Sequence, residues 1–125
     1  MIAAIDVGLK RIGLALCATS NIATPYPAIL KKNRDKAARD VDEFLNFWSV
    51  KKLVIGIPAS HDETARRIKH FATLLKFDVE IVFQIEDLSS IEAEDLLKGH
   101  VKLERDGRID SLAASIILQR YLAKN

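Results

Sequence analysis

Three acidic residues in this sequence have apolar neighbours that are unusual for a solvated carboxylate. Asp6 lies near the end of the apolar run that opens the chain, Glu86 follows the apolar segment 79–84, and Asp110 begins a helical pattern rich in alanine and isoleucine. Taking an unpaired carboxylate out of water costs several kcal/mol, so a buried acid is usually hydrogen-bonded, neutralised or bound to a metal ion. These three residues are therefore the first candidates for chemistry.

The fold decides whether the three acids work together. Carboxylates gathered at one point repel one another unless cations are present, and oxygen ligands of this kind suit Mg²⁺ or Mn²⁺. Two such ions can bind the attacking and leaving oxygens of a phosphodiester, so convergence would predict a nuclease of the two-metal-ion type. Taken singly, Asp6 can cap a turn, Asp110 can be a helix N-cap and Glu86 can be a solvated loop acid.

The segment around Asp6 predicts a central strand. Apolar residues occupy both alternating faces of residues 2–7, which is typical of a strand covered by helices on both sides. Residues 8–11 predict a turn, and residues 12–18 predict a second strand that forms a hairpin with the first. Asp6 would then lie near the carboxyl end of its strand, where α/β sheets place their ligand crevices.

Later segments alternate between helix and strand patterns. Pro25 and Pro27 confine a third strand within residues 22–30 to an edge of the sheet. Helices are predicted over 33–48, from residue 60 onward, over 89–99 and over 110–122, with strands over 53–57 and 79–84. Basic residues at 31, 32 and 34 favour a solvated helix end over a binding patch. The pattern predicts a mixed α/β sheet with helices on both faces.

The last predicted helix directs Asp110 towards the sheet. Ala113, Ala114, Ile117 and Tyr121 recur at helical steps from Asp110, so they share its face. The two small alanines would let the helix backbone come close to the strands. Asp110 is thus expected to be buried.

Composition favours one soluble domain over residues 1–125. Of the 125 residues, 49% are apolar and 29% are charged, and the formal net charge is +2. No apolar run reaches the ~20 residues of a membrane span, and no secretory signal is visible, so we expect a cytoplasmic protein without membrane association. The single cysteine, Cys17, is expected to be buried. His61, His70 and His100 lack metal-ligand spacing.

Four segments, in order along the chain, resemble the YqgF/RuvX family of bacterial proteins. They are residues 6–15 (DVGLKRIGLA), 56–58 (GIP), 86–90 (EDLSS) and 109–114 (IDSLAA), the last followed by 117–119 (ILQ). These segments are similar to the opening motif of the family, its Gly-Leu-Pro loop, its Asp-Glu-Arg-Leu-Thr-Thr motif and its closing helix. One such motif is weak, whereas four in order at fitting distances are specific, and together they span essentially the whole chain.

The resemblance implies a ribonuclease H-like fold, an α/β domain with a mixed five-stranded sheet and helices on both faces. It also implies that Asp6, Glu86 and Asp110 are catalytic carboxylates that bind Mg²⁺ or Mn²⁺. The family is related to Holliday-junction resolvases and is implicated in maturing the 5′ end of precursor 16S ribosomal RNA. The expected partner is structured nucleic acid, with precursor rRNA favoured over a four-way DNA junction, and the chain is expected to be a monomer or homodimer.

Basic residues close to the acids are candidates for holding the substrate. Lys10 and Arg11 come one turn after Asp6, within reach of a scissile phosphate, and Arg105 and Arg108 precede the last helix. Each of these four side chains could instead be a solvated surface residue. No aromatic platform for stacking single-stranded bases is visible.

Two positions depart from the pattern of the family. Ile85 stands where the family usually has Asp, and Asp87 stands where it usually has Arg, which inverts the charge at a place suited to a phosphate. The loop after Pro58 is short and lacks the expected glycines. We therefore expect altered substrate binding, with Asp87 as a less favoured candidate for a fourth metal ligand.

Two other functions stay open beside the nuclease that the sequence favours. Ile85 and Asp87 are compatible with a catalytically weak nucleic-acid-binding or ribosome-assembly protein. An Asp-x-Gly hairpin also occurs in the ATP-binding modules of actin and the sugar kinases, but that fold normally needs two such domains around the nucleotide.

Overall fold

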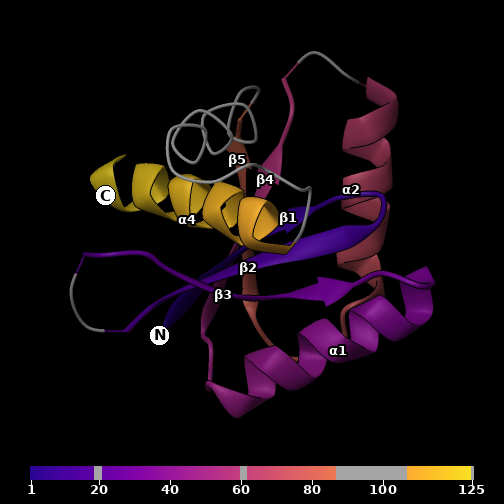
Figure 1. Ribbon diagram of the computed structural model, residues 1–125, viewed down its shortest axis with the longest axis horizontal. Coiled ribbons are helices and arrows are strands. Elements are labelled where there is room, and N and C mark those ends of the chain that lie inside the picture. Colours follow the sequence, from indigo (N-terminus) through magenta and orange to yellow (C-terminus); the bar gives the residue numbers. More distant parts are fainter. Residues whose placement is uncertain (19–20, 60–61, 87–106, 125) are drawn as a thin grey trace.

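The computed structural model describes residues 1–18, 21–59, 62–86 and 107–124 (Figure 1). Its strands are β1 (Ile2–Val7), β2 (Arg11–Cys17), β3 (Thr24–Leu30), β4 (Lys52–Ile57) and β5 (Glu80–Ile85). Its helices are α1 (Arg34–Phe47), α2 (Asp62–Leu74) and α4 (Gly107–Lys124). The helix predicted over 89–99 lies outside the described residues, and so does the capping residue predicted at position 60.

The five strands form one mixed sheet in the order β3-β2-β1-β4-β5. β1 pairs antiparallel with β2 and parallel with β4, β2 pairs antiparallel with β3, and β4 pairs parallel with β5. The predicted edge position of β3 is confirmed, since Pro25 and Pro27 cannot donate hydrogen bonds to a further strand. β1 is the central strand, as its two apolar faces indicate.

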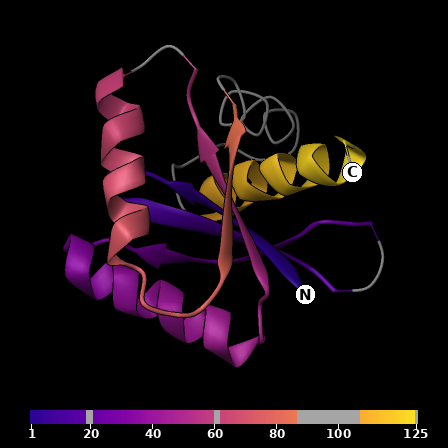
Figure 2. The same cartoon turned by 180° about the vertical axis from the view of Figure 1, so that it is seen from behind.

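Side chains of β1 alternate between two hydrophobic layers. Ala3 and Ile5 belong to the larger core cluster with residues of α1 and α2, whereas Ala4 packs in a second cluster with Ala114 and Leu118 of α4. Seen from behind, α1 and α2 cover the face of the sheet opposite to α4 (Figure 2). Even-numbered residues of β1, and thus Asp6, face α4.

Helix α4 crosses the sheet from the β3 side towards β5 (Figure 1). At its start, a Cβ added to Gly107 would lie 2.9 Å from the Cβ of Ala28 in β3, so the helix approaches this strand closely. Ser111 fixes the next turn, because its Oγ donates to the Tyr26 carbonyl at 2.5 Å and accepts from the Leu14 amide at 3.4 Å. The start of α4 is therefore tied to both β2 and β3.

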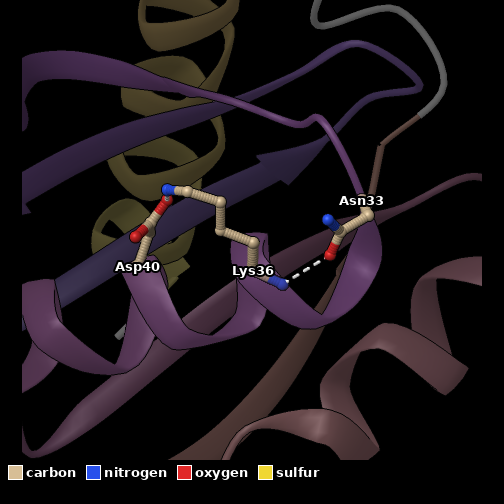
Figure 3. A network of polar contacts seen from close by, with 3 residues as sticks. All are labelled: Asn33, Lys36 and Asp40. Atoms are coloured by element: carbon tan, nitrogen blue, oxygen red, sulfur yellow. Dashed lines mark hydrogen bonds and ion pairs between the residues drawn. The ribbon is translucent and has the colours of Figure 1, made fainter.

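Helix α1 begins where its sequence predicts. The Asn33 side chain accepts a hydrogen bond from the Lys36 amide at 2.8 Å, and Lys36 Nζ pairs with Asp40 Oδ2 at 3.0 Å on the next turn (Figure 3). An N-cap of this type supplies an acceptor for an amide that lacks a helical partner. The cap fixes where the chain turns from β3 into α1.

Candidate active site

Asp6 is the second-to-last residue of β1, close to the carboxyl end of the strand. It pairs across the hairpin with Gly13 of β2, and residues that face each other in an antiparallel pair point to the same side of the sheet. That side is the one covered by α4, because Ala4, two residues earlier, packs against α4. The side chain of Asp6 is partly exposed rather than fully buried.

Gly13 brings Asp110 next to Asp6. A Cβ added to Gly13 would lie only 1.8 Å from the Asp110 carbonyl oxygen and 2.9 Å from the Ser111 amide nitrogen, so only glycine lets the helix backbone sit there. Asp110 is 5% exposed, as the helical pattern predicts. Because α4 begins at Gly107, Asp110 lies in its first turn and is not an N-cap. The positive end of the helix dipole favours a carboxylate at this position.

A small cleft opens beside Asp110 and the turn that follows β1. It has a volume of about 270 Å³ and is lined by Gly8, Leu9, Lys10, Arg11 and Asp110. Lys10 is exposed and Arg11 is partly exposed, and both belong to the turn that leads away from Asp6. The structure thus places the predicted carboxylate Asp110 and the predicted phosphate ligands Lys10 and Arg11 around the same space.

The side chain of Glu86 pairs with Arg120 and is not among the residues that line this cleft. Its Oε2 accepts a hydrogen bond from Arg120 Nη1 at 2.5 Å, and its side chain is 6% exposed while that of Arg120 is 39% exposed. The Glu86 amide donates to the Ile57 carbonyl at 2.8 Å, which continues the pairing of β5 with β4. Its Oε1 is buried and has no hydrogen-bond partner among the described residues. Glu86 is therefore a nearly buried acid in an ion pair.

The three predicted acids lie near the end of β1, after β5 and in the first turn of α4, and they do not form a compact cage. Arg120 follows Asp110 by ten residues, or about 15 Å along α4, and β5 is two strands, about 10 Å, from β1. Within the described parts of the chain, no group of three His, Cys, Asp or Glu side chains is arranged to hold a metal ion. In the described structure the backbone of Asp110 lies against Gly13, the cross-strand partner of Asp6, whereas Glu86 lies beside Arg120.

The remaining predicted substrate ligands are separate from this cleft or lie outside the described residues. Arg108 is exposed and lines a larger groove of about 620 Å³ between β3 and α4, together with Pro25, Tyr26, Pro27, Ala28, Gly107, Ser111 and Leu112. Arg105 and Asp87 fall outside the residues that the structure describes, so their predicted roles stay predictions.

Two residues that shape the candidate site, Gly13 and Arg120, are not among those that the sequence predicts. Gly13 sets how closely α4 approaches the sheet, and its signal is its position opposite Asp6 in the predicted hairpin. Arg120 is the partner of Glu86, and 34 residues separate the two in sequence. A basic residue on the last helix gives no local sign that it will face the end of β5. The contact depends on the angle at which α4 crosses the sheet.

The arrangement of strands and helices defines a fold class, the ribonuclease H-like fold. RuvC of T. thermophilus, solved with a Holliday junction substrate, is similar with a TM-score of 0.63 and 14% sequence identity, over 98% of this chain and 93% of that chain. The fowlpox virus resolvase, solved with Holliday junction DNA, is similar with a TM-score of 0.52 and 15% identity, over 97% of each chain. The predicted fold class is confirmed.

Sequence comparison narrows this class to one family. A family model described as "RuvX: Holliday junction resolvase" matches residues 1–124. A protein of Sulfurimonas denitrificans is 55% identical over 122 residues, covering 95% of this chain and 94% of its own. A protein of Sulfurovum sp. is 50% identical over 125 residues, covering 98% of both chains. Both relatives carry the name "Putative pre-16S rRNA nuclease".

The chain belongs to the RuvX family, and the resemblance seen in its four motifs is confirmed. No helix in the described parts of the chain is long and apolar enough to cross a membrane.

Proposed function

We propose that residues 1–125 act as one nuclease domain that hydrolyses phosphodiester bonds with the help of Mg²⁺ or Mn²⁺. The observation that carries this proposal is the cleft in which the buried Asp110 meets Lys10 and Arg11, with Asp6 beside it. Carboxylates and cations around one open space suit a phosphodiester, because the acids can bind a metal ion while the cations bind phosphate oxygens.

The residues present fit a magnesium or manganese ion. Mg²⁺ is commonly bound through one or two carboxylates, with water and substrate phosphate oxygens completing its coordination, so Asp6 and Asp110 would be sufficient protein ligands. A bound ion of this kind supplies Lewis-acid polarisation of the phosphate and an activated water. Glu86 remains the predicted third acid, and its buried Oε1 is the atom available for that role.

The residues around the cleft have distinct roles in this proposal. Lys10 and Arg11 hold non-bridging phosphate oxygens and orient the scissile bond against the carboxylates. Asp110, held by the close approach of α4 at Gly13, keeps its carboxylate in place while the substrate binds. Pre-organised charges in a partly dehydrated cleft stabilise developing negative charge more strongly than the same charges in water.

The substrate is proposed from the relatives. Their name favours precursor 16S rRNA, in agreement with the prediction from the motifs, and a four-way DNA junction is the alternative given by the family description. A junction resolvase must cut two strands, so that alternative needs a homodimer with two sites, whereas processing of one rRNA end is possible for a monomer.

A cleavage assay separates these possibilities. Purified protein and the Asp6→Asn variant are incubated with Mg²⁺ or Mn²⁺ and either a precursor rRNA fragment with its 5′ extension or a four-way DNA junction. We expect metal-dependent cleavage of the RNA that is lost in the variant, with the variant still folded by circular dichroism. Cleavage of the junction alone would support the resolvase alternative. Equal cleavage by both proteins would remove Asp6 from its proposed role.

A second candidate function is nucleic-acid binding without cleavage. The pairing of Glu86 with Arg120 favours it, because this acid is already neutralised by a protein side chain. Tight binding of both substrates without turnover in Mn²⁺, by a folded protein, would support this alternative over the nuclease.

A further inference from the structure

A second group of basic residues lies on the other side of the turn between β1 and β2. Lys31 follows β3, and its amide donates to the Lys10 carbonyl at 2.8 Å, while its Nζ donates to the Gly8 carbonyl at 3.4 Å. Gly8 and Lys10 also line the cleft beside Asp110. Lys31 is thus anchored directly behind the candidate active site.

Two arginines complete this group, which we call the cationic cluster: Lys31, Arg34 and Arg67. Arg67 comes from α2, and the ring of Phe71, one helical turn further on, lies 5.7 Å from Lys31 Nζ. Partial burial lowers the pKa of Lys31, and the nearby charges of Arg67 and Arg34 lower it further. In Figure 1 the β1–β2 turn, the end of β3 and the start of α1 lie on the same side, beside α2.

The cationic cluster has no counter-charge among the described residues. None of its three side chains is within ion-pairing distance of a carboxylate there, whereas Lys36, Lys52 and Arg120 all have acidic partners. Arg67 Nη1 is buried and without a hydrogen-bond partner in the same part of the chain. Asp35, next to Arg34, is exposed and forms no ion pair with another described residue. Like charges held together in this way reduce stability, so an external anion would relieve the strain between them.

The position of the cluster indicates which anion it takes. Lys31 bonds to the carbonyls of Gly8 and Lys10, which line the cleft, so a nucleic-acid strand with one phosphate at Lys10 and Arg11 can reach the cationic cluster by continuing past Gly8. The cationic cluster stands at that turn, on the face of the sheet covered by α1 and α2. A polyanion with regularly spaced phosphates can engage both groups at once, and a single small anion cannot.

We propose that Lys31, Arg34 and Arg67 bind the phosphate backbone of the substrate strand beyond the scissile bond. This inference rests on the proposed nuclease function. It assigns a binding role to residues 31 and 34, whereas the sequence alone favours the interpretation that they form a solvated helix end. Arg67 is the residue that changes this interpretation, because it lies one helical turn before Phe71, whose ring lies against Lys31, and that packing of α2 is invisible in the local sequence.

Salt-dependent binding tests the proposal without requiring cleavage. In an Asp6→Asn background, affinities for the precursor rRNA fragment and the four-way junction are measured across a salt series for the Lys31→Gln/Arg67→Gln variant. The slope of log K against log salt is negative, and each lost phosphate contact reduces its magnitude by about 0.7 for a single strand or 0.9 for duplex DNA. We expect a slope reduced by about 1.4 to 1.8 and an affinity reduced by roughly 10-fold or more at low salt.

Lys69→Gln is the matched control, because Lys69 is exposed on α2 and lies about 200° around the helix from Arg67. It should keep the full affinity and slope. Urea unfolding gives a second readout: the double variant should stay close to its parent in stability, since it removes the repulsion between the cations together with the weak Lys31 Nζ contacts to Gly8 and Phe71. An unchanged slope, or loss of binding equal to that of Lys69→Gln, would overturn the proposal. The two proposals can fail separately. If the slopes change as expected but the wild-type protein, with Asp6 intact, shows no metal-dependent cleavage, the nuclease proposal is contradicted and the cationic cluster is supported.

Discussion

Replacing Gly13 by alanine should damage the candidate site without touching either carboxylate. The added Cβ would lie 1.8 Å from the Asp110 carbonyl oxygen and 2.3 Å from its carbonyl carbon, whereas real Cβ atoms essentially never come closer than 3.0 Å. The obstacles are backbone atoms, which cannot rotate away. The start of α4 must therefore move from β2 by more than about 1 Å, and Asp110 moves with it.

The size of the effect follows from this displacement. Forcing an extra methyl group into a packed contact costs about 1–3 kcal/mol, which for a chain of this length lowers the melting temperature by roughly 4–12 °C. Displacing a catalytic group by about 1 Å can reduce the rate by ~100-fold. Gly13→Ala should thus remain folded at moderate temperature while its cleavage rate falls by ~100-fold.

Gly56→Ala is the matched control for this experiment. Its added Cβ would also meet α4, but at 2.4 Å from Ile117 Cδ1, the end of a side chain that can change rotamer. Ile117 lies seven residues, or about 10 Å, along the helix from Asp110. We expect Gly56→Ala to lose some stability and to keep cleavage within a few-fold of wild type.

The assay is single-turnover cleavage at saturating Mn²⁺ and at a temperature where both variants are folded by circular dichroism. Gly13→Ala should then be about 100-fold slower than Gly56→Ala. Wild-type stability and wild-type cleavage by Gly13→Ala would refute the view that the close contact of Gly13 with α4 positions Asp110.

Two further outcomes follow from ion pairing and burial. Arg120→Met should destabilise the fold by about 1–3 kcal/mol in urea unfolding, because it leaves the nearly buried Glu86 carboxylate without its partner. Adding Glu86→Gln to the same chain should restore most of the loss. An Arg120→Met protein as stable as wild type would contradict a structural role for the pair. Because the pKa of Lys31 is lowered from 10.5, the folded state releases its proton at a lower pH than the unfolded state. The stability of wild type relative to Lys31→Gln should therefore rise as the pH is raised from neutral to about pH 10. A difference in stability that stays flat or falls over this range would show that Lys31 is not held in a repulsive environment.

The strands and their faces were predictable because their signals are local. Alternating apolar residues in β1 predict a doubly covered strand, and Pro25 and Pro27 predict an edge, without knowledge of any distant contact. The burial of Asp110 was predictable for the same reason, since the alanines that follow it share its helical face. Cys17 is buried as expected from its apolar neighbours.

Contacts between distant segments could not be predicted from the same patterns. Glu86 is paired with Arg120 because α4 crosses the sheet at an angle that carries its second half towards β5. Phe71 lies against Lys31, with Arg67 one turn earlier on α2, because of the rotation of α2 about its own axis. Neither angle is encoded in a short window of sequence, and both depend on how the two hydrophobic layers fill. The sequence therefore predicts three candidate acids, whose roles stay predictions, but it does not predict that Glu86 pairs with Arg120.

Single-turnover cleavage by a set of carboxylate variants tests the central claim, that Asp6 and Asp110 form one metal-dependent site. The set is wild type, Asp6→Asn, Asp110→Asn and the double variant, with Asp78→Asn, an exposed acid before β5 at the opposite end of the sheet, as control. Groups that act as a unit are non-additive, so each single variant should lose ~100-fold or more and the double variant should lose little beyond that. Asp78→Asn should cleave like wild type. Mild losses in the single variants, or losses that simply multiply in the double variant, would contradict a shared site.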